Sequence, residues 1–141
     1  METRHAPAAR QLVDAWNTRD PERVIALLAE DHVYEDVTFG AVNRGPAETR
    51  AFFQGAYAAF PDIHFEATAA VLGPERGAVE WTMTGTHRGD MPGMPATGKP
   101  FRVRGATVFE IAGDKISRVS DYWDAATLLR QLGLMPEQAG A

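Results

Sequence analysis

An aspartate near the end of the chain lies in a pattern that calls for an explanation. The segment SDYWD, at 120–124, ends a run that alternates between apolar and polar residues as a β-strand does. Alternation places Asp121 on the same face as Val119 and Trp123, away from the polar side chains of the strand. An acid on an apolar face is costly unless it has hydrogen-bond partners or a chemical task.

Burial would make Asp121 a candidate for catalysis. An apolar surround raises the pKa of a carboxyl group, and a carboxyl group that titrates near neutrality can serve as a general acid or base. The alternative is a structural acid that is hydrogen-bonded to the backbone or to a tyrosine. His87 is a second candidate for acid or base chemistry, although its place at a strand end beside Arg88 also fits a solvated side chain.

Other kinds of catalytic site find no support in the sequence. The chain has no cysteine, which excludes thiolate nucleophiles and cysteine metal sites. Its four histidines lack the spacing of metal ligands, so we expect no metal. The segment GMPATGK, at 93–99, opens like a phosphate-binding loop, but Pro100 stands where Ser or Thr is required and a strand follows. We therefore expect no cofactor of the nucleotide type.

Composition indicates a single domain, 1–141, with a tail at 136–141 that we expect to fray. With 141 residues, 45% of them hydrophobic, the chain can bury one core but is too short for two. The net charge of −5 and the lack of a basic stripe argue against a nucleic-acid partner. No apolar run approaches the ~20 residues of a membrane span, and no signal-peptide pattern is visible. We expect a cytoplasmic protein that does not bind membranes.

Hydrophobic spacing predicts helices in the first part of the chain and strands in the second. The helices are expected at 8–19, from Pro21 through Leu28, at 46–60 and at 124–132. The strands are expected at 33–40, 63–72, 78–87, 100–111 and 115–123, with a loop at 40–46. Helices followed by an antiparallel meander are typical of the α+β class.

The predicted strands combine into a sheet with one apolar, aromatic face and one polar face. Helices carrying Trp16 and either Phe52 or Phe53 should cover the apolar face. Apolar walls with a few convergent polar groups describe a pocket for a small hydrophobic or aromatic molecule. The residues expected to line it are Trp16, Phe53, Trp81, Met83, Thr107, Phe109 and Trp123.

The residue pattern leaves two structural features undecided, the facing of the first strand and the role of the connection at 88–100. In the first strand, periodicity turns Val33, Val37 and Phe39 inward and Tyr34 and Asp36 outward, but a β-bulge would reverse this. The long connection at 88–100, rich in Gly and Pro, is either a rim or lid of the pocket or a plain elongated hairpin loop.

Several segments together resemble the SnoaL-like polyketide cyclases, of the NTF2-like, ketosteroid-isomerase-like superfamily. They are EWTMTGTHRG, MPATGKPFRVRG, VFEIAGDKI and SDYWD, and the resemblance covers roughly residues 8–133. It implies a cone, in which a strongly curved sheet wraps around a pocket closed by helices. It also implies a cofactor-free homodimer or homotetramer. We expect the subunits to meet through the polar outer face of the sheet, which bears Thr82, Thr84, Arg102 and Arg104.

The resemblance also implies a role for the aspartate. In the cyclases, the residue matching Asp121 is the general acid/base of an intramolecular aldol closure. In limonene epoxide hydrolase, a more distant relative, the matching aspartate activates water, and a Tyr and an Asn match Tyr34 and Asp36. This match turns both residues toward the pocket, where the carboxyls of Asp36 and Asp121 would titrate together. Asp36 or His87 would then bind the enolate oxygen.

The sequence departs from both relatives. The cyclases have histidines at the positions of Val119 and Thr107. The epoxide hydrolase has an Arg and an Asp on one strand, where this chain has either Thr82 and Thr84 or Met83 and Gly85. Three functions stay open: a cyclase or isomerase of polycyclic aromatic polyketide-like compounds, a tailoring hydroxylase or epoxide-opening hydrolase, and a binding module without catalysis.

Overall fold

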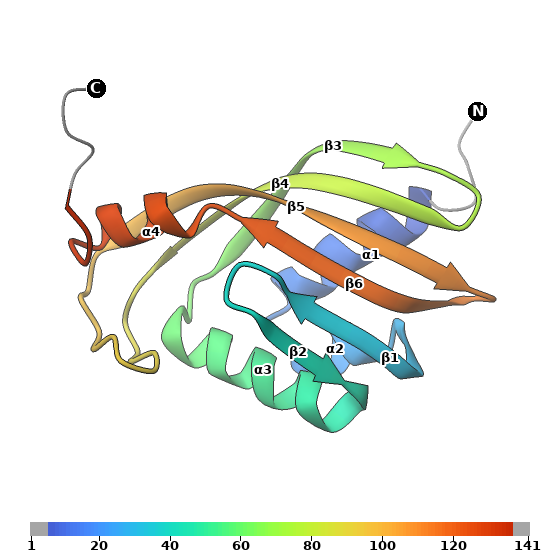
Figure 1. Cartoon of the computed structure of the whole chain (residues 1–141), viewed down its shortest axis with the longest axis horizontal. Coiled ribbons are helices and arrows are strands. Elements are labelled where there is room, and N and C mark those ends of the chain that lie inside the picture. The colour runs from blue at the N-terminus through green and yellow to red at the C-terminus, as the bar shows by residue number, and fades with distance from the viewer. Residues whose placement is uncertain (1–5, 137–141) are drawn as a thin grey trace.

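One curved, unclosed sheet carries the whole fold (Figure 1). The structure is a computed structural model that describes residues 6–136, so only Pro136 of the tail predicted to fray is described. The helices are α1 (Ala6–Asn17), α2 (Pro21–Ile25), α3 (Gly45–Ala59) and α4 (Ala125–Gln131). The strands are β1 (Leu28–Asp36), β2 (Ala41–Arg44), β3 (His64–Leu72), β4 (Arg76–Thr86), β5 (Pro100–Ala112) and β6 (Lys115–Trp123).

The order of strands across the sheet makes the first strand of the chain, β1, a neighbour of the last one, β6. The order is β2-β1-β6-β5-β4-β3, and all neighbours are antiparallel except β1 and β6, which are parallel. The predicted α+β fold with a curved, mostly antiparallel sheet is confirmed. The parallel pairing sets Asp36 directly beside Asp121.

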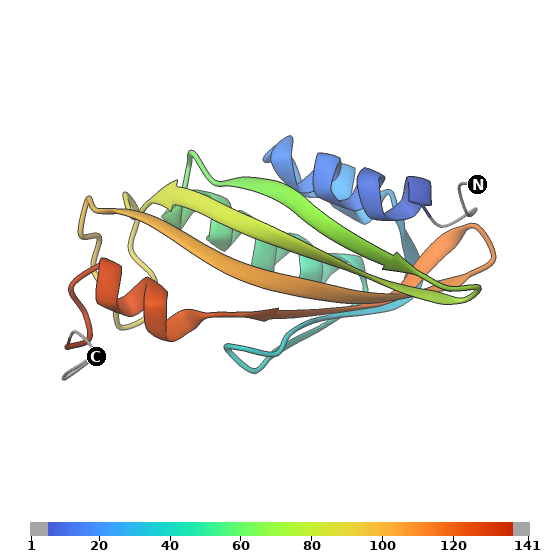
Figure 2. The same ribbon diagram turned by 90° about the horizontal axis from the view of Figure 1, so that it is seen from above.

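The helices cover the concave side of the sheet and its ends. Helix α1 packs along β3, and α3 packs along β1 and β2, while α4 lies beyond the end of β6 (Figures 1 and 2). As the spacing predicts, Leu12 and Trp16 of α1 and Phe53 of α3 are buried. Their burial joins helices and sheet into one hydrophobic core.

Two helix starts follow the capping rules. Asp20 accepts a hydrogen bond from the Glu22 backbone N–H at 3.0 Å, and Pro21 follows at the first helical position. Asp124 accepts from the backbone N–H of Thr127 at 3.0 Å and so caps α4. The helix that begins at Pro21 is shorter than predicted.

The first strand differs from the prediction in extent and in facing. It begins at Leu28, inside the segment predicted as helix, and ends at Asp36; the predicted loop at 40–46 contains the short strand β2. The pairing of β1 with β6 shifts register between Leu28 and Val33. The buried residues of β1 are Leu28, His32, Tyr34 and Asp36, all on the face opposite to Val33, and Tyr34 is 1% exposed. Periodicity alone was therefore wrong here.

Most buried positions in the three long strands alternate as predicted. On the concave face they are Val79, Trp81 and Met83 of β4, Phe101, Val103, Thr107 and Phe109 of β5, and Val119 and Asp121 of β6. Thr82, Ile116 and Ser120 break the alternation, since they too are buried, and for Thr82 and Ser120 the expected place on the exposed polar face was wrong. Gly105 of β5 pairs with both Trp81 and Trp123. A side chain at Gly105 would collide with the Trp81 indole, so the glycine leaves the space in which this ring lies.

Within residues 6–136, no helix has the length and apolar character needed to cross a membrane.

Candidate active site

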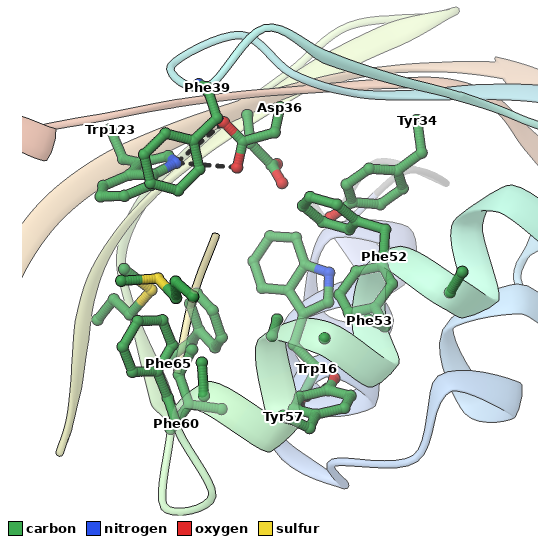
Figure 3. Close-up of a pocket in the computed structure, with 18 of the residues that line it drawn as sticks. Trp16, Tyr34, Asp36, Phe39, Phe52, Phe53, Tyr57, Phe60, Phe65 and Trp123 are labelled. Carbon is green, nitrogen blue, oxygen red and sulfur yellow. Dashed lines mark hydrogen bonds between the residues drawn. The ribbon is translucent and has the colours of Figure 1, made fainter. Parts of the chain in front are cut away.

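A cavity of about 580 Å³ lies between the concave face of the sheet and the helices α1 and α3. Aromatic side chains form most of its wall (Figure 3). Those lining it are Trp16, Tyr34, Phe39, Phe52, Phe53, Tyr57, Phe60, Phe65, Trp81 and Trp123. The ionisable groups among the described lining residues, apart from the two tyrosines, are the carboxyls of Asp36, Asp90 and Asp121.

Asp121 is held by a directed chain of hydrogen bonds. The Thr107 hydroxyl donates to Asp121 Oδ1 at 2.6 Å, and the Trp81 indole N–H donates to the Thr107 oxygen at 2.9 Å. Because an indole N–H can only donate, the Thr107 oxygen accepts from Trp81 and its hydrogen is committed to Asp121. Oδ1 therefore accepts from a hydroxyl whose direction is fixed.

The surroundings of Asp121 raise its pKa from 3.8 to about 7. Burial is the largest cause, since desolvation disfavours the charged form, and the charge of Asp36 acts in the same direction. Hydrogen bonds from Thr107 and Tyr34 act in the opposite direction but do not cancel the effect of burial. The carboxyl can therefore exchange a proton at neutral pH, as a general acid or base requires.

Tyr34 provides a second hydroxyl beside Asp121. Burial and the negative charge of Asp121 raise the Tyr34 pKa well above 10, so the phenol keeps its proton. The Trp16 indole N–H also interacts with this hydroxyl, and this interaction lowers the Tyr34 pKa. The side chains of Tyr34 and Trp16 lie next to each other in Figure 3, with Tyr34 at the upper right.

Asp36 is a separate carboxyl with its own donors. The Trp123 indole N–H approaches its two oxygens at 3.2 and 3.0 Å, as drawn in Figure 3, and the Phe39 backbone N–H donates to Oδ1 at 2.9 Å. Burial nevertheless raises the Asp36 pKa, against the effect of these donors. Both Tyr34 and Asp36 line the cavity, the orientation that the family resemblance implied and periodicity did not.

Three residues expected at the site lie outside the cavity wall. Thr107 lies behind Asp121 as its hydrogen-bond partner, and Phe109 is fully buried in the core. His87 is also fully buried, so the interpretation as a solvated side chain was wrong. Its Nδ1 accepts from the Thr97 backbone N–H at 3.3 Å, and its ring packs 5.7 Å from that of Phe60. The structure does not bring His87 to Asp121.

The long connection between β4 and β5 contributes to the cavity. Met91 and Met94 line it, together with Asp90 and Pro92, and the two methionines pair through their backbones. The N–H groups of Arg88 and Gly89 both donate to the Ala59 carbonyl at 3.0 Å, which attaches the start of this connection to the end of α3. The structure thus favours the rim over the plain hairpin loop.

Several lining residues were missed by sequence reasoning. They are Tyr57, Phe60, Phe65, Met91 and Met94, and Phe52 joins Phe53 rather than replacing it. Phe39, which periodicity turned inward, does line the cavity. Spacing along α3 could have found Phe60, which lies on the same helical face as Phe53 and Ala56. Alternation with Ile63, on the face opposite His64, could have found Phe65, although β3 is an edge strand that is mostly exposed.

Within residues 6–136, no three His, Cys, Asp or Glu side chains come together as a metal site. What the described residues provide is a buried carboxyl at the end of an aromatic cavity. This arrangement can move a proton to or from a flat organic molecule.

The family is decided by the sequence as a whole. Residues 6–132 match the model of the SnoaL-like polyketide cyclase family. The chain belongs to this family. The SnoaL-like domain therefore spans nearly all of the described residues, from α1 to the last turn of the fold. Comparison with curated proteins gives no match.

Solved structures show the same SnoaL-like fold. A proposed SnoaL-like polyketide cyclase from Jannaschia sp. CCS1 has a TM-score of 0.85 at 16% identity, covering 96% of this chain and 95% of that one. AclR from Streptomyces galilaeus, a proposed hydroxylase, has a TM-score of 0.83 at 24% identity, covering 96% and 89%. IdmH from Streptomyces antibioticus, a proposed polyketide cyclase, has a TM-score of 0.79 at 24% identity, covering 93% and 99%. At these identities the likeness establishes the fold.

Proposed function

We propose that this SnoaL-like protein is a cofactor-free enzyme that uses Asp121 as its general acid/base. Its reaction is the removal of a proton next to a carbonyl group, followed by intramolecular aldol closure or by return of the proton elsewhere. The single observation that carries the proposal is a carboxyl that is 9% exposed, has a pKa of about 7 and faces an aromatic cavity.

In this reaction Asp121 alone can take up the proton and later return it. The ionised carboxylate takes the proton from carbon, while Thr107 keeps the carboxyl in place, and the substrate becomes an enolate. In an aldol closure the enolate carbon attacks a second carbonyl of the same molecule, and the new alkoxide takes the proton back from Asp121. The reaction is an isomerisation, so no external donor or acceptor is needed.

The cavity indicates the class of substrate. Its volume of about 580 Å³ lies within the range of small-molecule sites. Aromatic walls favour a flat, mostly apolar molecule, such as a polycyclic aromatic polyketide. No Arg, Lys or His is present among the described lining residues, so nothing there would neutralise a carboxylate or phosphate on the ligand.

The two other functions have less support. Epoxide opening in the relative depends on an arginine, and the described lining residues include none. Tailoring hydroxylation is the second candidate, and its support is the shared fold with AclR. A binding module without catalysis would need the same cavity but no proton transfer at Asp121.

Proton removal can be tested without knowing the natural substrate. We suggest 2-tetralone, a flat bicyclic ketone, dissolved in D₂O, with deuterium uptake beside its carbonyl followed by NMR. The protein should accelerate the uptake, and Asp121→Asn should remove the acceleration. Asp124→Asn is the matched control, because Asp124 is exposed and an asparagine still caps α4. Binding of 2-tetralone without any uptake would favour the binding module.

A further inference from the structure

His87 lies outside the cavity wall, yet its side chain is fully buried. Its Nε2 atom has no hydrogen-bond partner among the described residues. A buried ring nitrogen without a partner costs free energy, so an apolar side chain would fill the same space at a lower cost. The presence of a histidine at this position therefore needs an explanation other than packing.

The explanation lies at the other nitrogen of the ring. The Thr97 backbone N–H donates to His87 Nδ1 at 3.3 Å, and the Thr97 hydroxyl lies 3.2 Å from the same atom. Because a backbone N–H can only donate, Nδ1 carries a lone pair, and we assign the hydrogen of the neutral ring to Nε2. The imidazole therefore serves as an acceptor for a backbone group ten residues further along the chain.

The connection at 88–100 forms one side of the cavity and is hydrogen-bonded to itself. Met91 and Met94 line the cavity, and their backbone groups bond to each other at 2.9 and 2.8 Å. Asp90 Oδ1 accepts from the Ala96 backbone N–H at 2.7 Å. These bonds fold the connection into a compact hairpin, but they do not attach it to the rest of the protein.

The start of the connection is attached to helix α3. The backbone N–H groups of Arg88 and Gly89 both donate to the Ala59 carbonyl at 3.0 Å. A side chain at Gly89 would collide with this end of the helix, so the backbone passes close to it. The outgoing arm of the hairpin is therefore fixed by its own backbone.

The returning arm is attached through His87. The His87 backbone bonds to Gly98 and Lys99 at 2.8 and 3.0 Å, and the imidazole adds the bond from Thr97. This side-chain bond reaches one residue deeper into the connection than the backbone pairing does. It also joins two of the segments that carry the family resemblance, EWTMTGTHRG and MPATGKPFRVRG.

We propose that His87 is a positioning residue that holds the connection at 88–100 against the cavity, through the bond from Thr97 to Nδ1. The inference rests on the proposed function for what the cavity encloses, a flat aromatic substrate. Methionine side chains are flexible, so Met91 and Met94 can select a substrate by shape only if their backbone is held in place. His87 thereby acts on substrate binding and not on proton transfer.

Two substitutions separate the acceptor atom from the volume of the ring. His87→Leu fills a similar space without an acceptor, whereas His87→Asn is smaller but can place an amide oxygen near the position of Nδ1. Hydrogen–deuterium exchange of the Thr97 amide, followed by NMR, reports the bond. The exchange should be roughly 3- to 10-fold faster in His87→Leu, the loss expected for one hydrogen bond, and closer to wild type in His87→Asn.

The slowest amides of β5 are the internal control for this exchange experiment, because they report the stability of the whole fold. They should change less than the Thr97 amide in His87→Leu. Faster exchange in His87→Asn than in His87→Leu would show that ring volume matters and not the acceptor. Equal acceleration of Thr97 and of the β5 amides would show that His87 acts on the whole fold. Either result would overturn the proposal.

Substrate binding provides a second readout. The dissociation constant of 2-naphthol, a flat bicyclic phenol, should rise in His87→Leu and stay near wild type in His87→Asn. With 2-tetralone, His87→Leu should raise KM and leave the pH midpoint of kcat where the wild type has it. A shifted midpoint would place His87 in the chemistry and contradict the positioning role.

The unaltered protein allows a third measurement. The chain has four histidines, and comparison with His87→Asn identifies the ring signals of His87 in long-range ¹H–¹⁵N spectra. The neutral ring should carry its hydrogen on Nε2. A hydrogen on Nδ1 would rule out the bond from Thr97 and with it the proposal.

The two proposals fail separately. If Thr97 exchange and 2-naphthol binding depend on the His87 acceptor but no deuterium uptake by 2-tetralone occurs, the positioning role stands and the enzyme proposal fails. If uptake depends on Asp121 while Thr97 exchange ignores the substitutions at His87, the enzyme proposal stands and the positioning role fails.

Discussion

Asp36 and Asp121 are paired neighbours on the parallel strands β1 and β6, and both carboxyls lie in the wall of one aromatic cavity. The charge of Asp36 is one of the causes that raise the Asp121 pKa, and burial raises the pKa of both. Two buried carboxyls in one site do not ionise independently, so the pair holds a proton at neutral pH more readily than either would alone.

Replacing Asp36 should therefore change the titration of Asp121. In Asp36→Asn the amide oxygen can still accept from Trp123, but the negative charge is gone. The Asp121 pKa should fall, and the midpoint of the pH–rate profile for 2-tetralone exchange should move to lower pH. An unchanged midpoint would show that the two carboxyls do not interact.

Thr107 should act through the position and pKa of Asp121, not through contact with substrate. Thr107→Val removes a hydrogen bond that lowers the Asp121 pKa and leaves the Trp81 indole without its acceptor. The midpoint of the pH–rate profile should move to higher pH. Thr107→Ser keeps the hydroxyl and is the control; it should stay near wild type, and a Ser variant that behaves like Val would contradict the role of the hydroxyl.

Burial of Asp121 should cost stability at high pH. The unfolded chain ionises this carboxyl near its ordinary pKa of 3.8, whereas the folded protein holds the proton until about pH 7. Between these values the folded state binds more protons, so stability falls as pH rises, by up to roughly 4 kcal/mol at full ionisation.

Asp121→Asn should remove this cost. Urea unfolding should show the variant and the wild type closest in stability at about pH 4, with an advantage of the variant that grows up to about pH 7 and then levels off. Asp36 also has a raised pKa, so the difference between the two proteins, rather than either curve alone, reports Asp121. A difference that does not change with pH would contradict the raised pKa.

The sequence predicted the long strands well and the first strand poorly. Alternation placed Trp81, Phe109 and Asp121 on the correct face because β4, β5 and β6 pair with little irregularity over most of their length. Periodicity turned Tyr34 and Asp36 outward because it followed Val33 and Val37. The pairing of Tyr34 with Val119 and of Asp36 with Asp121 on the neighbouring strand β6 instead puts both residues on the buried face. The family resemblance supplied the orientation that local pattern could not.

The hydrogen bonds that link Trp81, Thr107 and Asp121 could not be predicted from the sequence either, because they depend on how the strands pair. Thr107 and Trp81 lie on different strands, and only their cross-strand register with β6 brings the indole, the hydroxyl and the carboxyl into one line. The burial of His87 depends on Thr97 folding back across the β4–β5 connection. Contacts of this kind depend on tertiary geometry rather than on spacing along the chain.

The outer face of the sheet should form the contact of a homodimer. On this face Val108 and Tyr122, from the adjacent strands β5 and β6, are 38% and 48% exposed. Burying such side chains against a second subunit would stabilise the assembly. Light scattering at micromolar concentration should give a dimer or higher mass for the wild type and a smaller mass for Val108→Asp combined with Tyr122→Asp. A monomeric wild type would contradict this prediction.

The most direct test of the account is the pH dependence of 2-tetralone deuterium exchange in the wild type, Asp121→Asn and Asp124→Asn. Because the base is the ionised form, the wild-type rate should rise with pH to a plateau, with a midpoint at about pH 7. Asp124→Asn should follow the same curve. Asp121→Asn should be slower by roughly 10²-fold or more and should lack this midpoint. A midpoint that persists in Asp121→Asn, or equal losses in the two variants, would contradict the assignment of Asp121 as the base.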